Sequence, residues 1–384
     1  MQRSRRPPIL IAAGGTGGHL FPARALGEEL ARRDVAVELM TDHRARGFGE
    51  DFPARHIHLV PAATPVGRSP VSAARAVLTL MRGVMVARRQ IRRLKPPLVV
   101  GFGGYPSVPP LLAARLSGVA SLIHEQNAVM GRANRLLARF ASAVALSVPN
   151  PANAARAALA RSVVTGNPVR DAVIEAAELP YAAPTEDGEI RLLVFGGSQG
   201  ARVFSRIVPE ALGLIDASLR RRIRLVQQCR AEDLDRVRGS YYDFGFEAEL
   251  APFFADLPRR MAAAHLVIAR SGASSVSEIA AIGRPAILVP LPGAIDNDQR
   301  ENARALARAG GAWMIEEREL DAGRLAGEIG ALMKAPERLA GAAAAARGAG
   351  RRDAVRVLAD LVLFMAGGGS PEGFAAVGSG NEDK

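Results

Sequence analysis

The sequence predicts an α/β fold with two doubly wound, Rossmann-like domains, and three observations support this prediction. Strand-like apolar runs alternate with helix-like segments along the chain, which is typical of parallel sheets covered by helices. Two similar units, at residues 9–18 and 191–200, each consist of a strand, a glycine-rich loop and the start of a helix. The length of 384 residues and the hydrophobic content of 48% are sufficient for two cores.

The expected elements fall into two series. The first series has strands at residues 9–13, 35–40, 98–102 and 120–124, with a helix at residues 23–33. The second series has strands at residues 191–195, 223–227, 266–269 and 286–290. The turn-forming tripeptide Gly166-Asn167-Pro168 separates the two series. We therefore predict domains at residues 1–165 and 166–350, and a Gly/Ser-rich disordered tail at residues 367–384.

The charge is distributed unevenly over a chain whose net charge is +12. Residues 1–165 hold 23 basic and 8 acidic side chains, whereas residues 166–384 hold 27 and 30. We therefore expect the first domain to face a polyanion or an anionic lipid surface. The aromatic content of 5% argues against nucleic acid as the partner. A single cysteine, Cys229, and the lack of a long apolar run near the N-terminus predict a cytoplasmic protein or one bound at a membrane surface.

Glycine- or serine-rich loops follow four of the predicted strands, at residues 14–18, 103–105, 196–200 and 271–274. Such a loop between a strand and a helix lets the backbone approach a phosphate group. In doubly wound folds, ligands bind at the carboxyl ends of the strands, where these loops lie. The first loop does not have the dinucleotide-binding pattern, because Leu20 stands where the third glycine would be. It is not a P-loop either, because no Gly-Lys-Ser/Thr follows it.

Six motifs, in this order, resemble those of one known family. They are Gly14-Gly15-Thr16-Gly17-Gly18-His19, Gly103-Gly104-Tyr105, His124-Glu125-Gln126-Asn127, Gly166-Asn167-Pro168-Val169-Arg170, Gly196-Gly197-Ser198-Gln199-Gly200-Ala201, and Arg270-Ser271-Gly272-Ala273 with the segment up to Ala280. From about residue 9 to about residue 365, the chain is similar to the MurG-type bacterial glycosyltransferases of peptidoglycan synthesis. The resemblance implies the GT-B fold, in which two Rossmann-like domains face a cleft and a last helix, here residues 351–365, returns to the first domain.

The resemblance also implies the reaction. GlcNAc would pass from UDP-GlcNAc to the C4 hydroxyl of the lipid-linked MurNAc-pentapeptide called lipid I, with inversion, giving lipid II and UDP. The enzyme would work without a cofactor at the cytoplasmic face of the inner membrane, as a peripheral membrane protein. Its implied partners are UDP-GlcNAc, lipid I, and proteins of cell division and wall synthesis.

The resemblance further implies roles for individual residues of the donor site. Arg170 and Ser198 would bind the diphosphate, and the backbone of Phe254 would bind the uracil. Contacts with the phosphates and the ribose would come from Ala273, Ser274, Ser275, Val276, Ser277 and Glu278. Gln299 and Asn302 would bind the GlcNAc hydroxyls, beside Asp298, which stands where relatives often carry a histidine. The first-domain residues that would close on the donor are Thr16, Gly17, Gly18 and Asn127.

Sugar transfer needs a base for the acceptor hydroxyl and positive charge for the departing diphosphate. His19 is the candidate base, because a helix N-terminus keeps an imidazole neutral; a loop histidine bonded to a carbonyl is the alternative. Glu125 is a second catalytic candidate, which could orient a base or contact the acceptor. Ser275-x-x-Glu278 also fits a capping box, and Arg170 could form a surface ion pair with Asp171. We expect no metal site, since the histidines and the cysteine show no ligand spacing.

Residues 71–95 predict a helix that binds a membrane surface. Six apolar residues share a side expected to face the core: Val77, Leu80, Val84, Ala87, Ile91 and Leu94. The opposite side carries arginines, namely Arg75, Arg82, Arg89 and Arg93, and between the two sides lies a stripe of Leu78, Met81 and Met85. An apolar stripe beside an arginine row is typical of an interfacial helix, although a buried helix with one solvated face would also fit.

Two other functions stay open on the sequence alone. A UDP-GlcNAc 2-epimerase of similar two-domain architecture would need carboxylates and histidines for elimination chemistry. A non-enzymatic protein could bind nucleic acid or an anionic membrane through the basic first half.

Overall fold

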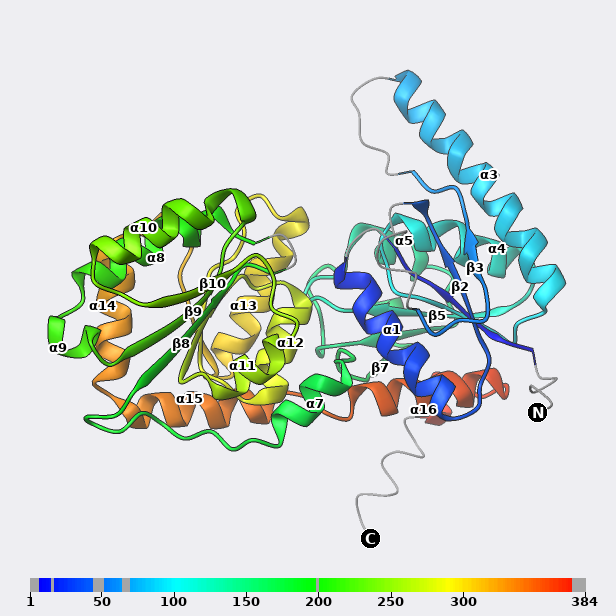
Figure 1. Cartoon of the computed structure of the whole chain (residues 1–384). Helices are drawn as coiled ribbons and strands as arrows, with labels where there is room; N and C mark the ends of the chain where they lie inside the picture. Colours follow the sequence, from blue (N-terminus) through cyan, green and yellow to red (C-terminus); the bar gives the residue numbers. More distant parts are fainter. Residues whose placement is uncertain (1–6, 15–16, 44–51, 64–69, 198–199, 375–384) are drawn as a thin grey trace, which may run out of the picture. The chain divides into compact units, whose positions relative to one another are not determined.

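The structure is a computed structural model that describes residues 7–14, 17–43, 52–63, 70–197 and 200–374. The chain divides into two compact units, one formed by residues 1–170 with 352–384 and the other by residues 171–351. Each unit contains one parallel sheet with helices packed against it (Figure 1). The predicted α/β class with two Rossmann-like sheets is therefore confirmed.

The first unit is built on a seven-stranded parallel sheet in the order β3-β2-β1-β4-β5-β6-β7. Its strands are β1 (Ile9–Ala12), β2 (Val37–Thr41), β3 (Ile57–Leu59), β4 (Leu98–Gly101), β5 (Ala120–Glu125), β6 (Ala143–Leu146) and β7 (Ser162–Val164). The central strand β1 pairs with β2 on one side and β4 on the other. Because β1, β4 and β6 are buried on both faces, they are continuous apolar runs rather than alternating ones.

The helices of the first unit cover both faces of this sheet. They are α1 (Gly17–Arg32), α3 (Pro70–Leu94), α4 (Val108–Leu116), α5 (Arg132–Leu137), α6 (Arg156–Leu159) and α16 (Ala354–Ala366). Helix α1 begins at Gly17, before the predicted residue 23, and continues through Pro22. Proline removes one backbone hydrogen-bond donor there, and the helix is held by its buried face, which includes Leu26 and Leu30.

Helix α16 lies against α1 in the first unit, as Figure 1 shows. Its residues Leu358, Leu361 and Val362 are fully buried in the same core cluster as Leu26 of α1. The predicted helix at residues 351–365 therefore exists, but it begins at Ala354.

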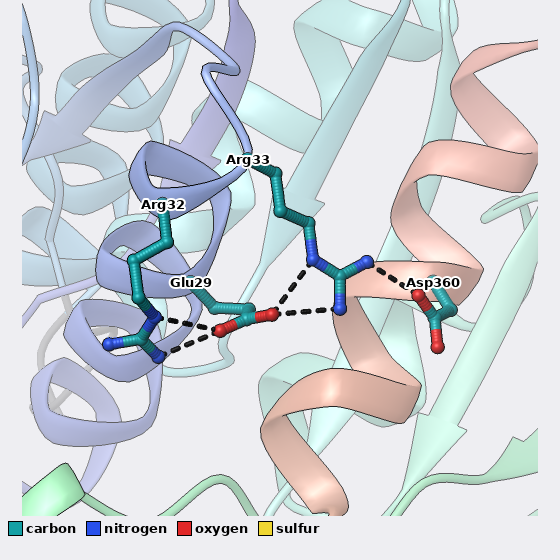
Figure 2. A network of polar contacts seen from close by, with 4 residues as sticks. All are labelled: Glu29, Arg32, Arg33 and Asp360. Carbon is teal, nitrogen blue, oxygen red and sulfur yellow. Dashed lines mark hydrogen bonds and ion pairs between the residues drawn. The ribbon is translucent and has the colours of Figure 1, made fainter.

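A polar network links the C-terminal end of α1 to α16 (Figure 2). Glu29 accepts hydrogen bonds from Arg32 and Arg33, and Arg33 also donates to Asp360 of α16. Burial alone would raise the pKa of Glu29, but the two arginines lower it below its usual value. The network therefore ties the C-terminal end of α1 to a helix that is more than 300 positions later in the chain.

The second unit contains a six-stranded parallel sheet in the order β10-β9-β8-β11-β12-β13. Its strands are β8 (Ile190–Phe195), β9 (Ile223–Gln228), β10 (Ala248–Ala251), β11 (Leu266–Ala269), β12 (Ala286–Leu288) and β13 (Ala312–Met314). Its helices are α7 (Asp171–Ala177), α8 (Arg202–Leu214), α9 (Ala217–Arg220), α10 (Leu234–Asp243), α11 (Leu257–Ala263), α12 (Ala273–Ile282), α13 (Asp298–Arg308), α14 (Ala322–Met333) and α15 (Pro336–Ala349).

Five strands and part of the tail differ from the sequence-based expectation. The missed strands are β3, β6, β7, β10 and β13, which are short or alanine-rich and owe their pairing to the strand beside them. Residues 367–374, assigned to a disordered tail, are placed in the structure, because Phe374 packs against Phe364 with 5.7 Å between ring centroids. Residues 375–384 lie outside the described residues.

Candidate active site

The strand orders place the glycine loops where a doubly wound sheet binds ligands. In the first sheet, the order reverses between β1 and β4, so the loop after Ala12 lies beside the Gly103-Gly104 turn. The hydroxyl oxygen of Ser107 lies 2.9 Å from the carbonyl oxygen of Ala12 and 2.7 Å from that of Gly103, so its single proton is shared between the two loops. In the second sheet, the same reversal lies between β8 and β11. Each unit therefore presents a glycine loop at its topological switch point.

His19 lies in the first turn of α1, next to the second of these loops in the first unit. A Cβ atom added to Gly104 would be 3.3 Å from Cδ2 of the His19 ring, and Gly104 has a φ of 68°. The glycine thus permits both the turn and the close approach of the imidazole. The structure places the candidate base at a helix N-terminus, as predicted, although its catalytic role stays a prediction.

Arg170 is near the same helix. Its guanidinium lies over the ring of Phe21, 5.7 Å from the centroid, and Phe21 is two residues after His19. A cation–π contact of this kind orients the guanidinium. The guanidinium of Arg170 therefore lies close to the start of α1 in the first unit.

Glu125 is buried at the end of β5, where it organises the loop that follows. One carboxylate oxygen accepts from the backbone N–H (3.0 Å) and the side-chain amide (3.3 Å) of Asn127, and the other accepts from Gly131 N–H and the Asn134 amide, both at 2.9 Å. Burial raises the pKa of Glu125, while these donors act in the opposite direction. A carboxylate that is 2% exposed and bonded to four donors holds the Asn127 loop in place. Its catalytic role stays a prediction.

His124 precedes Glu125 on β5 and lies in the interior of the first unit. It is fully buried, its Nε2 is 3.0 Å from the carbonyl of Gly166, and its ring lies 5.3 Å from that of Phe102. Burial lowers the pKa of His124 to about 4. The neutral imidazole therefore donates to Gly166 and ties β5 to the end of the first unit's sheet.

In the second unit, α12 begins at the switch point. Its N-cap residue is Gly272, which has no side chain that could cap the helix, and its first turn has no acidic residue. The hydroxyl of Ser274 is buried and has no hydrogen-bond partner among the described residues. The first N–H groups of a helix with its positive dipole end suit a phosphate group at this position.

The same geometry rules out the capping box as an explanation of Glu278. A capping box requires Ser275 at the N-cap, but the helix begins two residues earlier, at Ala273. Glu278 is 6% exposed in the second turn, whereas Ala273 to Ser277 are half-buried. The sequence-based alternative to ribose binding is therefore wrong, and ribose binding stays a prediction.

Gln299 and Asn302, on α13, are bonded to the loops around this helix start. Oε1 of Gln299 accepts from the N–H of Leu291 at 3.1 Å, and its binding of a sugar hydroxyl stays a prediction. Asn302 is 4% exposed and donates to the carbonyl of Ser271, whose hydroxyl donates to the Gln299 carbonyl. Asp298 accepts from the Gln299 N–H at the start of the helix. Asn302 thus holds the loop before α12 in place.

Of the remaining residues predicted to bind the donor, the structure describes Phe254, Gly17 and Gly18 but not Thr16 or Ser198. Phe254 is 8% exposed, and the guanidinium of Arg260 lies 4.5 Å from its ring centroid, so its backbone is held by a packed side chain. Gly18 is in the first turn of α1, at the same helix start as Gly17. Thr16 and Ser198 lie outside the described residues.

Helix α3 exposes the predicted apolar stripe. Leu78, Met81 and Met85 are 51%, 58% and 64% exposed, and Arg75, Arg82, Arg89 and Arg93 are also exposed. The expectation for Val77 was wrong, because it is 54% exposed and extends the stripe, while Ala76 is buried in its place. No helix in the described part of the chain is long and apolar enough to cross a membrane.

Gly83 explains how the other face of α3 is packed. A Cβ at this position would be 2.1 Å from the carbonyl oxygen of Pro61 and 3.0 Å from the Pro109 ring. The helix thus approaches its neighbours so closely that only glycine fits, and Ala87 and Ile91 are buried on the same side.

Two residues at the carboxyl edge of the second sheet were given no role from the sequence, although Arg270 belongs to the sixth motif. Arg270 is 7% exposed, pairs with Glu317 and donates to the carbonyls of Val289 and Pro290, so it joins the ends of β11 and β12. Gln228 ends β9 with its amide bonded to two other loops. Both are polar residues at strand ends with no distinctive sequence pattern. Their role in joining loops follows only from hydrogen bonds to residues distant in the sequence.

Two Rossmann-like units with glycine loops at their switch points are typical of proteins that bind nucleotides. Residues 9–146 match the glycosyltransferase family 28 N-terminal domain, and residues 191–358 match its C-terminal domain. The chain belongs to glycosyltransferase family 28.

Curated relatives are similar over nearly the whole chain. Proteins from Methylobacterium sp. (strain 4-46) and Nitrobacter hamburgensis are 56% and 53% identical, over 94% and 95% of this chain and 97% and 99% of their own length. Each is named UDP-N-acetylglucosamine–N-acetylmuramyl-(pentapeptide) pyrophosphoryl-undecaprenol N-acetylglucosamine transferase. The resemblance inferred from the six motifs is confirmed.

Solved structures agree with this relationship. The crystal structure of Acinetobacter baumannii MurG superposes with a TM-score of 0.77 at 28% identity, covering 93% of this chain and 99% of that one. A UDP-N-acetylglucosamine 2-epimerase superposes with a TM-score of 0.65 at 14% identity, covering 94% of this chain and 97% of that one, which shows a shared fold alone. The comparisons therefore favour the transferase over the epimerase.

Proposed function

We propose that this protein transfers GlcNAc from UDP-GlcNAc to the C4 hydroxyl of lipid I, with inversion, and releases lipid II and UDP. The observation that carries the proposal is the start of α12 with glycine at its N-cap, at the β8–β11 switch point, in a chain 52–56% identical to curated proteins named as N-acetylglucosamine transferases. A helix start of this kind suits the diphosphate of a nucleotide sugar. The product lipid II would serve cell-wall synthesis; contacts with cell-division and wall-synthesis proteins stay a prediction.

Donor binding is proposed to follow the roles implied by the family. The α12 start, Ser198 and Arg170 bind the diphosphate, and Glu278 binds the ribose. The backbone of Phe254 binds the uracil, and the NH2 group of Gln299 binds a GlcNAc hydroxyl. Asn302 acts indirectly, since its amide already holds the loop before α12. The remaining proposed contacts are those of Thr16, Gly17, Gly18 and Asn127.

The proposed chemistry is a single displacement. The C4 oxygen of the acceptor bonds to the anomeric carbon of GlcNAc, while the bond from that carbon to the β-phosphate oxygen breaks. The hydroxyl proton passes to His19, and the electron pair leaves with UDP. Positive charge from Arg170 and the helix dipole stabilises the developing charge on the diphosphate.

The proposal is tested by following UDP release. Purified protein with UDP-GlcNAc and a lipid I analogue should release UDP, and either substrate alone should give no release above background. A product with a new β-glycosidic linkage by NMR would establish inversion. Formation of UDP and 2-acetamidoglucal or ManNAc from UDP-GlcNAc alone would instead establish the epimerase.

We further propose that α3 docks on the cytoplasmic surface of the inner membrane. Its exposed stripe of Leu78, Met81 and Met85, extended by Val77, lies beside the exposed arginine row. Apolar side chains can enter the acyl boundary, while arginines bind anionic headgroups. Docking would bring the enzyme to an acceptor that is anchored in the lipid.

Liposome flotation tests this docking. The wild type should float with anionic vesicles at low salt and less at high salt, because salt screens the arginines. Changing Leu78, Met81 and Met85 together to serine should reduce flotation and leave turnover of a soluble acceptor analogue intact. A matched triple change of the exposed Leu179, Leu214 and Tyr242 in the second unit should have no effect. Undiminished flotation of the α3 variant would place the membrane face elsewhere.

A further inference from the structure

Gln228 joins two loops at the carboxyl edge of the second sheet. It is the last residue of β9, which pairs with β8 on one side and β10 on the other. Its side-chain oxygen accepts from the N–H of Gly196 at 3.0 Å, and its side-chain nitrogen donates to the carbonyl of Pro252 at 3.0 Å. The side chain is 6% exposed, so these two bonds form away from solvent.

Both loops are parts of the proposed donor site. Gly196 opens the glycine loop after β8, and it is tightly packed, since a Cβ there would be 2.3 Å from the N atom of Ala201. Pro252 follows β10 and precedes Phe254, the residue proposed to bind uracil, by two positions. One amide therefore connects the loop for the diphosphate with the segment for the base.

We propose that Gln228 is a positioning residue that sets the spacing between the diphosphate loop and the uracil segment. A nucleoside diphosphate binds tightly only when both of its ends fit at once, so this spacing governs affinity for UDP more than affinity for either part. The inference rests on the proposed function, because it assigns the two loops to one UDP moiety.

The neighbouring Gln227 provides a matched control. It is the same residue type on the same strand and is fully buried, but its side-chain oxygen accepts from the hydroxyl of Tyr241 in the core. Gln227→Met therefore measures how much stability the protein loses when a buried glutamine of β9 is replaced, while the hydrogen bonds to the two loops are kept.

The experiment measures inhibition constants of UDP, uridine and inorganic pyrophosphate against UDP-GlcNAc turnover in the full chain. In Gln228→Met, the constant for UDP and the KM for UDP-GlcNAc should rise about tenfold, in line with the loss of two hydrogen bonds. The constants for uridine and for pyrophosphate should stay within about twofold, and kcat should change less than KM. Gln227→Met should lower the melting temperature without changing the ratio of UDP to uridine inhibition.

Three outcomes would overturn the inference. UDP inhibition equal to that of the wild type would show that the spacing does not depend on Gln228. Equal weakening of UDP, uridine and pyrophosphate, with a lower melting temperature as in Gln227→Met, would show a structural role only. A wild-type protein that releases no UDP and binds none would contradict the proposed function, and the inference would fail with it.

Discussion

His19→Ala is expected to lower kcat by about 10²–10⁴-fold, while the affinity for UDP changes little. The imidazole lies in the first turn of α1, against Gly104, and in the proposed mechanism it accepts the proton of the acceptor hydroxyl. Single-turnover transfer to a lipid I analogue and UDP binding by calorimetry measure the two quantities separately.

The matched control for this variant is His56→Ala, which removes an exposed histidine of the same unit. It should leave kcat unchanged. A His19→Ala protein with full activity would show that the imidazole is a structural loop residue, and so would one that loses its fold.

Glu125→Ala is expected to destabilise the first unit by about 2–4 kcal/mol, because it leaves buried N–H donors without an acceptor. The affected donors belong to Asn127, Gly131 and Asn134. Urea unfolding measures the loss, and amide hydrogen exchange should accelerate selectively in residues 126–134.

A matched control for this second variant is Glu28→Ala, which removes a partly exposed ion pair with Arg24 on α1. Its cost should be at most about 0.5 kcal/mol. Glu125→Gln keeps one acceptor oxygen but turns an NH2 group toward the other donors, so it should destabilise the first unit less than Glu125→Ala. Loss of turnover in Glu125→Gln far beyond its loss of stability would contradict the positioning role.

The fold was predictable where local chemistry is strong. Strands such as β1 and β11 are fully apolar because they are buried on both faces, and a glycine loop follows β1, β4 and β8. The short strands β7 and β13 have no comparable sequence pattern. Each has three residues, and so short a segment becomes a strand only where it pairs with a neighbouring strand. The position of α16 was expected from the family resemblance and not from any local pattern.

The candidate site was predictable in outline only. The glycine loops and the helix starts follow from strand–loop–helix patterns, so the sequence alone determined which strand ends carry the loops proposed to bind the nucleotide sugar. The tertiary structure decided what individual polar residues do: Glu125 meets donors up to nine positions away, and Gln228 meets loops 32 and 24 positions away. It also decided that α12 starts too early for Ser275 to cap it. Periodicity and turn chemistry are local properties, whereas a buried hydrogen bond depends on which distant residue the packed chain places opposite it.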